Sequence, residues 1–155
     1  MLNEDYKEIL QLLLKNKVGF LVVGAYAMAT HGYPRATGDL DIWVEPSAAN
    51  STKVYQSLSE FKAPLSQITK NTFSQKGIIL QIGVAPRRID IITKIDGVEF
   101  KQAYRNRQDI KIEAIKVPFL SKKDLIKNKG STKRDKDKLD VRYLKELTRT
   151  RKKRL

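Results

Sequence analysis

The chain has 155 residues, of which 41% are hydrophobic, and this is enough for one domain with its own core. Its 31 lysines and arginines outnumber its 17 acids, and the net charge of +14 favours a polyanionic partner, nucleic acid first, although a solvated basic surface has the same composition. The absence of cysteine excludes disulfides, thiolate zinc sites and cysteine nucleophiles.

Nothing in the chain indicates a membrane segment or an export signal. No apolar run approaches the ~20 residues needed to cross a bilayer, and the first residues lack the basic and apolar segments of a signal peptide. We therefore expect a cytoplasmic protein with no membrane partner.

The first expected elements are a helix, a strand and a shorter helix. Apolar residues in 5–15 recur at i, i+3, i+4 and i+7, which predicts an amphipathic helix. Residues 18–23 are mostly apolar, as in a buried strand, and a short helix follows over 25–30. Because Gly24 stands where strand passes into helix, backbone N–H groups there can receive phosphate. His31, the one histidine, lies in the next turn and is expected to be structural or solvated rather than catalytic.

Two acids mark the following strand. Asp39 and Asp41 are one residue apart, and side chains alternate along a strand, so both project from one face. Paired carboxylates on a rigid strand suit a hard cation such as Mg²⁺. Solvent-facing acids on a half-buried strand are the alternative. The opposite, buried face is expected to consist of Leu40, Ile42 and Val44.

The loop before these acids adds two candidates for nucleotide binding. A guanidinium can contact phosphate through two parallel hydrogen bonds, and Arg35 lies four residues before Asp39. Thr37 is included with it, although Thr37 and Gly38 also fit a simple turn. An ordinary surface arginine is the alternative for Arg35.

A third acid lies inside a later strand. Residues 77–84 and 88–93 read as the two strands of a hairpin, and Asp90 stands between Ile89 and Ile91. A carboxylate in such a strand is costly to bury without a partner, so a metal or a cation is expected beside it. A structural salt bridge is the alternative.

The remaining pattern predicts mostly helices. Ser47 or Asn50 can cap a helix that runs to about residue 62. Further on, we expect a short helix over 98–107, short strands over 110–112 and 115–119, a helix over 122–129 capped by Ser121, and a final helix from about 135 to 147.

The glycine and the acids together resemble a known signature. Gly24-Ala25, followed by Asp39-x-Asp41 on the next strand, is similar to the DNA-polymerase-beta-like nucleotidyltransferase superfamily, in particular to small bacterial members such as the AbiEii-like toxins. In that superfamily a third carboxylate comes from a strand paired beside the one with the two acids, a place that Asp90 matches. The superfamily usually has Gly-Gly or Gly-Ser, so Ala25 offers phosphate only its backbone N–H.

A second resemblance covers residues 124–144. Small nucleotidyltransferases of this kind carry Leu-Ile-x-x-Lys and then Arg-x-Lys-Asp-x-x-Asp. The resemblance implies that Lys129 neutralises triphosphate, with Arg134 and Lys136 as helpers, although Lys136 equally fits ordinary surface basicity. The two acids are expected to cap a helix or to pair with nearby bases. The matching positions are Leu125, Ile126, Lys129, Arg134, Lys136, Asp137 and Asp140.

The resemblance implies both a fold and a reaction. The fold would be an α/β domain with a small mixed, largely antiparallel sheet flanked by helices. Asp39, Asp41 and Asp90 would converge and hold two Mg²⁺ ions, with Mn²⁺ as an alternative, for transfer of NMP from an NTP to a hydroxyl. The NTP would be held by Gly24, Ala25, Arg35, Thr37, Lys129, Arg134 and Lys136.

The domain is expected over residues 1–148, with 121–148 as a helical carboxyl-terminal part and 149–155 as a basic, disordered tail. Residues 121–155 hold 15 Lys and Arg against 5 Asp and Glu, which is +10 of the total +14. The tail is either an electrostatic handle for RNA or DNA or a solubilising segment.

The acceptor stays open at this stage. The basic end favours RNA, and the toxin-like resemblance favours a tRNA 3′ end and a cognate antitoxin protein as a partner. A protein hydroxyl or a small molecule such as an aminoglycoside are alternatives. The rival hypothesis is a basic module that binds nucleic acid or a partner without turnover.

Overall fold

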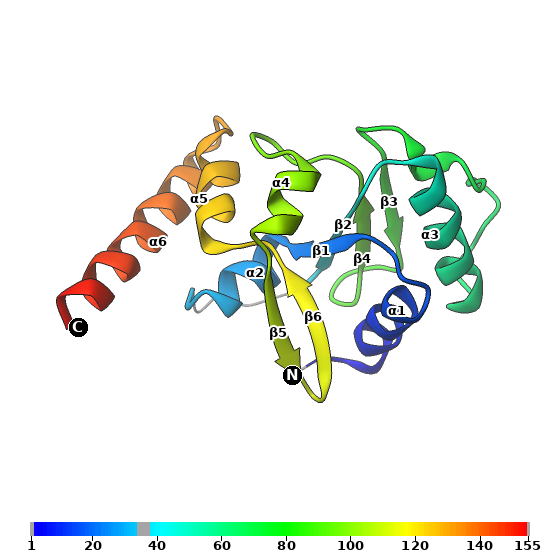
Figure 1. Cartoon of the computed structure of the whole chain (residues 1–155), viewed down its shortest axis with the longest axis horizontal. Helices are drawn as coiled ribbons and strands as arrows, with labels where there is room; N and C mark the ends of the chain where they lie inside the picture. The colour runs from blue at the N-terminus through cyan, green and yellow to red at the C-terminus, as the bar shows by residue number, and fades with distance from the viewer. Residues whose placement is uncertain (1, 34–37, 155) are drawn as a thin grey trace.

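The computed structural model describes residues 2–33 and 38–154, with the backbone alone described over 148–154 (Figure 1). Arg35 and Thr37, both predicted to bind nucleotide, lie outside the described residues.

The described part of the chain forms one six-stranded sheet in the order β3-β4-β2-β1-β6-β5. Three neighbouring pairs are antiparallel, β1 with β2, β3 with β4 and β5 with β6, and two are parallel, β1 with β6 and β2 with β4. The expected mixed, largely antiparallel sheet is therefore confirmed. Its strands are β1 (Phe20–Val23), β2 (Leu40–Val44), β3 (Ile79–Ile82), β4 (Ile89–Ile92), β5 (Gln108–Ile112) and β6 (Ile115–Phe119).

Helices flank this sheet, and short polar side chains fix where several of them begin. Ser47 accepts a hydrogen bond from the N–H of Asn50, and Ser121 accepts one from the N–H of Asp124, so both predicted caps are present. The helices are α1 (Glu4–Lys15), α2 (Gly24–Thr30), α3 (Ala48–Glu60), α4 (Phe100–Arg105), α5 (Lys122–Gly130) and α6 (Asp135–Arg154), with a 3₁₀ turn at Thr72–Ser74.

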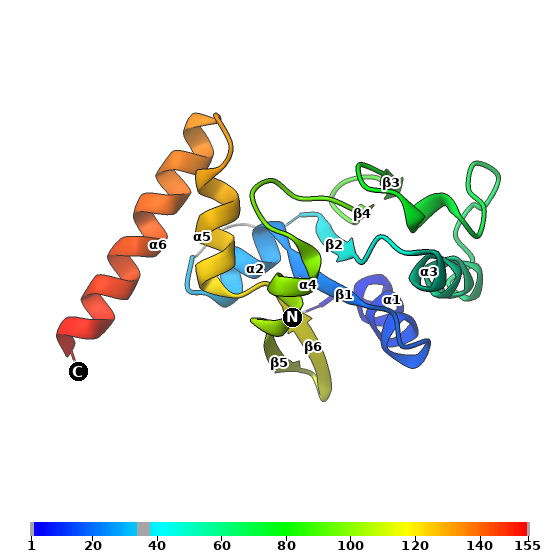
Figure 2. The same ribbon diagram turned by 45° about the horizontal axis from the view of Figure 1, so that its top comes forward.

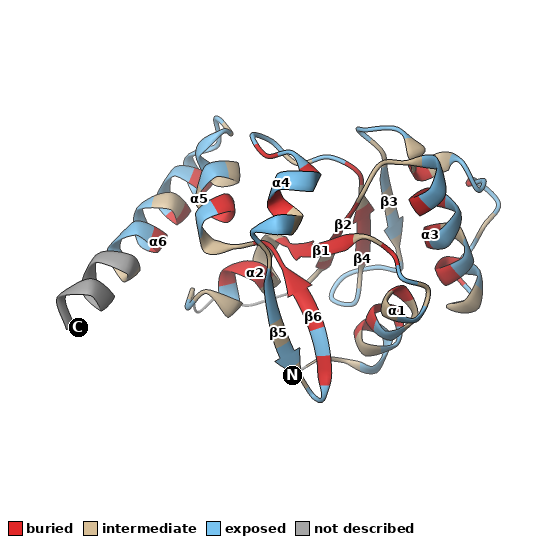
Figure 3. Cartoon of the chain, in the orientation of Figure 1, coloured by how far each residue is buried: buried red, intermediate tan, exposed pale blue. Residues whose placement is uncertain are grey.

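The middle of the sheet is buried and its edges are exposed (Figure 3). Every residue of β1 is buried, whereas β3 and β5 at the two edges contain no fully buried residue. On β2, Ile42 and Val44 are buried as predicted, and Asp41 and Trp43 project from the other face. Trp43 packs edge-to-face on Phe100 of α4, with ring centroids 5.1 Å apart. The acids therefore share their face of the sheet with α4.

The final helix is longer than predicted. The apolar pattern predicted an end near Leu147 and a disordered tail from Arg149, but the backbone of α6 continues to Arg154 (Figure 2). Arginine and lysine are good helix formers, and extending an existing helix needs no new nucleation, so the loss of apolar periodicity did not mark its end.

A buried acid joins α6 to α5. Asp137 is fully buried and accepts hydrogen bonds from Thr132, Lys129 and Arg134 at 2.6, 3.2 and 2.8 Å. Asp140, also buried, lies 3.5 Å from the Lys129 ammonium. The expectation that the two acids pair with nearby bases is confirmed, and these contacts fix the angle between the last two helices.

Asp137→Ala should therefore destabilise the protein strongly. Removing one partner of a buried ion pair leaves the Lys129 charge with only the longer contact to Asp140 and costs about 3 kcal/mol. Burial alone would raise the pKa of Asp137, but Thr132, Lys129 and Arg134 hold it below its ordinary value. Because a depressed acid pKa stabilises the fold at neutral pH, this contribution is lost as the pH falls below about 4.

Urea unfolding at pH 7 and pH 3 measures both effects. Asp135→Ala, at an exposed position in the first turn of α6, is the control and should cost less than about 1 kcal/mol. Equal losses for the two variants would contradict a structural role for Asp137.

Candidate active site

The three acids predicted as a triad lie together at the start of β2 and β4. Asp41 and Asp90 are direct register partners on these parallel strands, so their side chains project from the same face. Asp39 immediately precedes β2 and is linked to Asp90 through Arg88. The guanidinium of Arg88 lies 2.7 Å from Asp39 Oδ2 and 2.9 Å from Asp90 Oδ1.

The close approach of the acids changes the chemistry of the central one. Burial raises the pKa of Asp41 to about 7, and the charges of Asp90 and Asp39 together with a hydrogen bond to Asp90 act in the same direction. Near neutral pH, Asp41 is therefore poised between its two protonation states. A cation that replaced the Asp41 proton would relieve the repulsion.

Arg88 was not predicted as a site residue. The sequence indicated Arg88 only as the first residue of the expected strand 88–93, and the structure shows that its guanidinium lies beside two carboxylates. Among the described residues, no three acids or histidines are arranged as a ready-made metal site. The guanidinium accounts for this, because it occupies the space between Asp39 and Asp90. The oxygen donors themselves are of the kind that Mg²⁺ prefers.

Gly24 approaches the central acid so closely that no side chain fits between them. It adopts φ of +69°, a left-handed conformation that glycine accepts readily. A Cβ built on Gly24 would overlap the Asp41 carboxylate, with Asp41 Cγ only 3.0 Å away. The predicted strand-to-helix turn at Gly24 is thus present, and it lies directly against Asp41. Ala25 follows it as a half-exposed residue of α2.

A polar pocket opens beside Gly24 and Asp41, and the carboxyl-terminal motif closes it. The pocket has a volume of about 260 Å³. Lys129 and Arg134 line it as predicted by the motif, together with Lys94, which was not predicted. Lys136 is exposed and does not line this pocket.

The three cations that line this pocket differ in how far they are already paired with acids of the fold. Lys129 and Arg134 are both paired with Asp137, and Lys129 also with Asp140, so these two cations are largely balanced within the fold. Lys94 is exposed on the loop after β4. Lys94 is therefore an additional cation that could pair with an anion near Asp41. The sequence motif had indicated Lys129 for this role.

A tyrosine hydroxyl from α1 connects the segments that carry the acids. The buried Tyr6 lies within hydrogen-bond distance of the carbonyls of Gly38, Pro86 and Arg88, and it donates its one proton to one of them at a time. Burial, with Tyr26 and Asp39 nearby, raises the pKa of Tyr6 to about 12, so the hydroxyl stays protonated. The sequence pattern predicted only an apolar helix face at Tyr6, because the carbonyls that its hydroxyl reaches are remote in the chain.

His31 has the structural role that was expected. Its Nε2 lies 2.8 Å from the carbonyl oxygen of Leu120, and burial lowers its pKa, so the neutral ring donates to that carbonyl. The contact ties the end of α2 to the segment before α5.

The fold is that of nucleotidyltransferases. TM1012 of Thermotoga maritima, which carries a provisional assignment as a nucleotidyltransferase, is similar over 98% of this chain and 94% of its own, with a TM-score of 0.58 and 18% identity. The lincosamide antibiotic adenylyltransferase LnuA, solved with lincomycin bound, is similar over 94% of this chain and 97% of its own, with a TM-score of 0.57 and 17% identity. At sequence identities of 18% and 17%, the similarity shows a shared fold and nothing further.

Other comparisons add nothing to this result. No protein-family model and no curated protein matches the chain. Within the described residues, no helix is long and apolar enough to span a membrane.

Asp41→Asn should make the metal-free protein less sensitive to pH. A carboxyl whose pKa is raised from about 4 in the unfolded chain to about 7 in the fold reduces stability as the pH rises through that interval. The variant should therefore gain about 2–3 kcal/mol relative to wild type between pH 5 and pH 8. Urea unfolding in EDTA measures this, with Asp109→Asn on β5 as the control. A parallel pH dependence in wild type and Asp41→Asn would contradict the crowding of the acids.

Gly24→Ala should disturb the site through sterics alone. The left-handed backbone costs about 1–2 kcal/mol for alanine, and the methyl group must also displace the Asp41 carboxylate. Gly38→Ala is the matched control, because a Cβ there meets no atom within 4 Å. Thermal unfolding of both variants is the measurement, and an equal effect at the two glycines would refute the close contact with Asp41.

Proposed function

We propose that this protein is a Mg²⁺-dependent nucleotidyltransferase that transfers NMP from an NTP to an acceptor hydroxyl. The observation that carries the proposal is the position of Asp41. On a nucleotidyltransferase fold, it lies beside Asp90, close to Asp39 and against the Gly24 turn, and it lines a pocket with three cations. Carboxylates that repel one another beside a cationic pocket suit a site for metal ions and phosphate.

Asp39, Asp41 and Asp90 would hold two Mg²⁺ ions, or Mn²⁺ as an alternative. When bound, the metal ions neutralise charge on the reacting phosphate and acidify the attacking hydroxyl. Arg88 has to release Asp39 and Asp90 for this, and its guanidinium is then available for a phosphate oxygen. Asp90 is the candidate acceptor of the hydroxyl proton.

Backbone and cationic groups would hold the triphosphate. Gly24 and Ala25 offer backbone N–H groups, and Lys94, Lys129 and Arg134 offer positive charge from the walls of the same pocket. Arg35, Thr37 and Lys136 remain candidates from the sequence. Charge that is in place before the reaction stabilises the leaving pyrophosphate without reorganisation.

RNA is the acceptor that the charge favours. The net charge of +14 suits a polyanion, and a tRNA 3′ end with a cognate antitoxin protein would follow if the chain is functionally close to the AbiEii-like toxins. A small molecule is the second candidate, and the fold shared with LnuA, an antibiotic adenylyltransferase, supports it. A protein hydroxyl is the third.

Two observations favour the rival hypothesis, a module that binds nucleic acid or a partner without turnover. Arg88 already compensates two of the three carboxylates, so the acids have an internal cation and their clustering does not by itself require a metal. Ala25 in place of a second glycine or a serine points the same way. Divalent-metal binding separates the two functions.

The test is to incubate the protein with each labelled NTP, Mg²⁺ and either total RNA or a panel of small hydroxylated antibiotics. Wild type should label one acceptor class. Asp41→Asn should lose about 100-fold or more of this activity, since metal-bound charge is worth several kcal/mol in the transition state. Asp109→Asn is the matched control and should keep the activity. Transfer at the normal rate by Asp41→Asn would exclude the mechanism, and no transfer by wild type to any acceptor would favour the non-catalytic module.

A further inference from the structure

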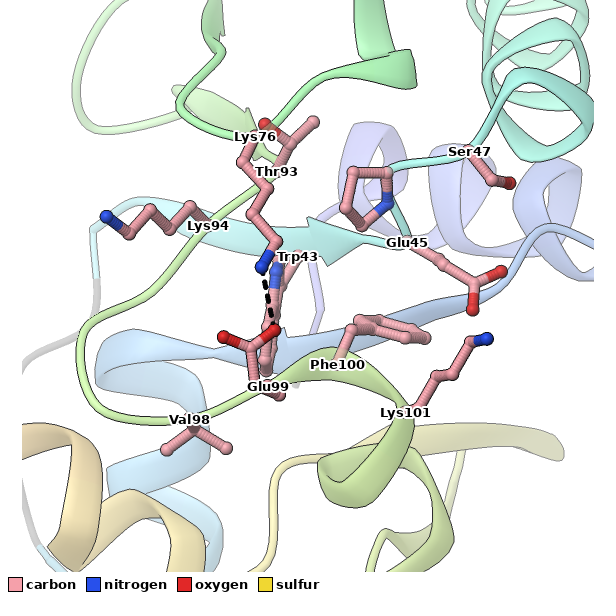
Figure 4. Close-up of a pocket in the computed structure, with 11 residues that line it drawn as sticks. Trp43, Glu45, Ser47, Lys76, Thr93, Lys94, Val98, Glu99, Phe100 and Lys101 are labelled. Carbon is pink, nitrogen blue, oxygen red and sulfur yellow. Dashed lines mark hydrogen bonds and ion pairs between the residues drawn. The ribbon is translucent and has the colours of Figure 1, made fainter.

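A second, larger pocket lies next to the candidate active site on the same face of the sheet. Trp43 follows Asp41 by two residues on β2, so both side chains project from that face. The pocket has a volume of about 410 Å³, within the range of small-molecule sites, and Trp43, Phe100, Val98 and Pro46 form its apolar walls (Figure 4). Lys94 lines both this pocket and the cationic pocket beside Asp41, so the two adjoin.

The indole of Trp43 carries an unused hydrogen-bond donor into this pocket. Trp43 is 2% exposed, and its Nε1 has no hydrogen-bond partner among the described residues. A buried N–H without an acceptor is unfavourable and rare in folded proteins, because it has lost water without a replacement. A ligand that carries a hydrogen-bond acceptor in the plane of an aromatic ring would accept a hydrogen bond from the Trp43 N–H.

A weak ion pair lines the same pocket. The Lys76 ammonium lies 2.8 Å from Glu99 Oε2, and both side chains line the pocket together with Trp43 (Figure 4). The two side chains are 55% and 70% exposed. Exposed ion pairs of this kind contribute little to stability, so a ligand can displace this one readily.

We propose that this pocket binds the nucleoside half of the NTP, while the phosphates occupy the cationic pocket beside Asp41. This proposal rests on the proposed function and specifies its substrate site. A nucleobase has a flat ring for the apolar walls and ring nitrogen or carbonyl acceptors for the Trp43 N–H. Lys94, at the boundary of the two pockets, lies where the phosphates join the nucleoside.

Trp43 itself reports on this pocket, because it is the one tryptophan in the chain. Its fluorescence should change saturably when the full chain is titrated with NTPs or with the corresponding nucleosides. Inorganic tripolyphosphate should bind, as measured by calorimetry, without that change. This difference between nucleosides and tripolyphosphate is the result expected from two adjoining subsites.

Two kinds of variant probe the contacts. Trp43→Phe keeps an apolar ring but removes the donor, and it should weaken NTP binding about threefold to tenfold in calorimetry while leaving tripolyphosphate binding unchanged. Glu99→Gln, at a side chain that is 70% exposed, removes the ion pair that a ligand has to displace and should strengthen nucleoside binding about twofold to threefold. Glu60→Gln is its control, because it breaks the corresponding Lys15 ion pair between α1 and α3.

The outcomes separate this proposal from the proposed function. If NTPs and tripolyphosphate bind equally well and neither nucleosides nor NTPs alter Trp43 fluorescence, the nucleoside site is refuted and the triphosphate site stands. If an acceptor found by the transfer assay changes Trp43 fluorescence and neither nucleosides nor NTPs do, the pocket belongs to the acceptor and the proposal is overturned. If neither NTP nor tripolyphosphate binds, the proposed function fails and this proposal fails with it.

Discussion

The site depends on mutual repulsion among three carboxylates that the sheet holds on one face. The parallel pairing of β2 with β4 puts Asp41 directly beside Asp90, and Asp39 lies one position before β2. The fold tolerates this through Arg88, which bridges the two outer acids, and through a raised pKa at the central one. In the proposed function, a bound cation would replace both compensations.

Other parts of the molecule keep the acids in place. Tyr6, from the first helix, reaches the carbonyls just before Asp39 and at Arg88, and so connects the two segments that deliver the carboxylates. Gly24 gives the space that the Asp41 carboxylate needs. The cluster of Asp137 and Asp140 with Lys129 sets the two last helices along the cationic pocket. The Tyr6 contacts join segments that are far apart in the chain, whereas the Lys129 contacts join two consecutive helices.

The two adjoining pockets suggest how an anionic and an apolar portion of one substrate could be separated. The pocket at Gly24 and Asp41 is cationic, and the pocket at Trp43 and Phe100 is mainly apolar. Lys94 belongs to both. A substrate with phosphate at one end and a ring at the other matches this division of chemistry, whereas an extended polyanion matches only the first pocket.

The sequence by itself pointed to the class of fold and to the three acids through a resemblance to a known signature. Period-two alternation, a local property of the chain, gave the common face of Asp39 and Asp41. A motif also singled out Lys129 and Arg134, which line the same pocket as Asp41. Only the tertiary structure decided which charges are already paired. Lys129 turned out to be held by two buried acids, Arg88 to bridge Asp39 and Asp90, and Lys94 and Tyr6 to face the site. Such pairings depend on distances between remote segments, and no local pattern in the chain encodes them.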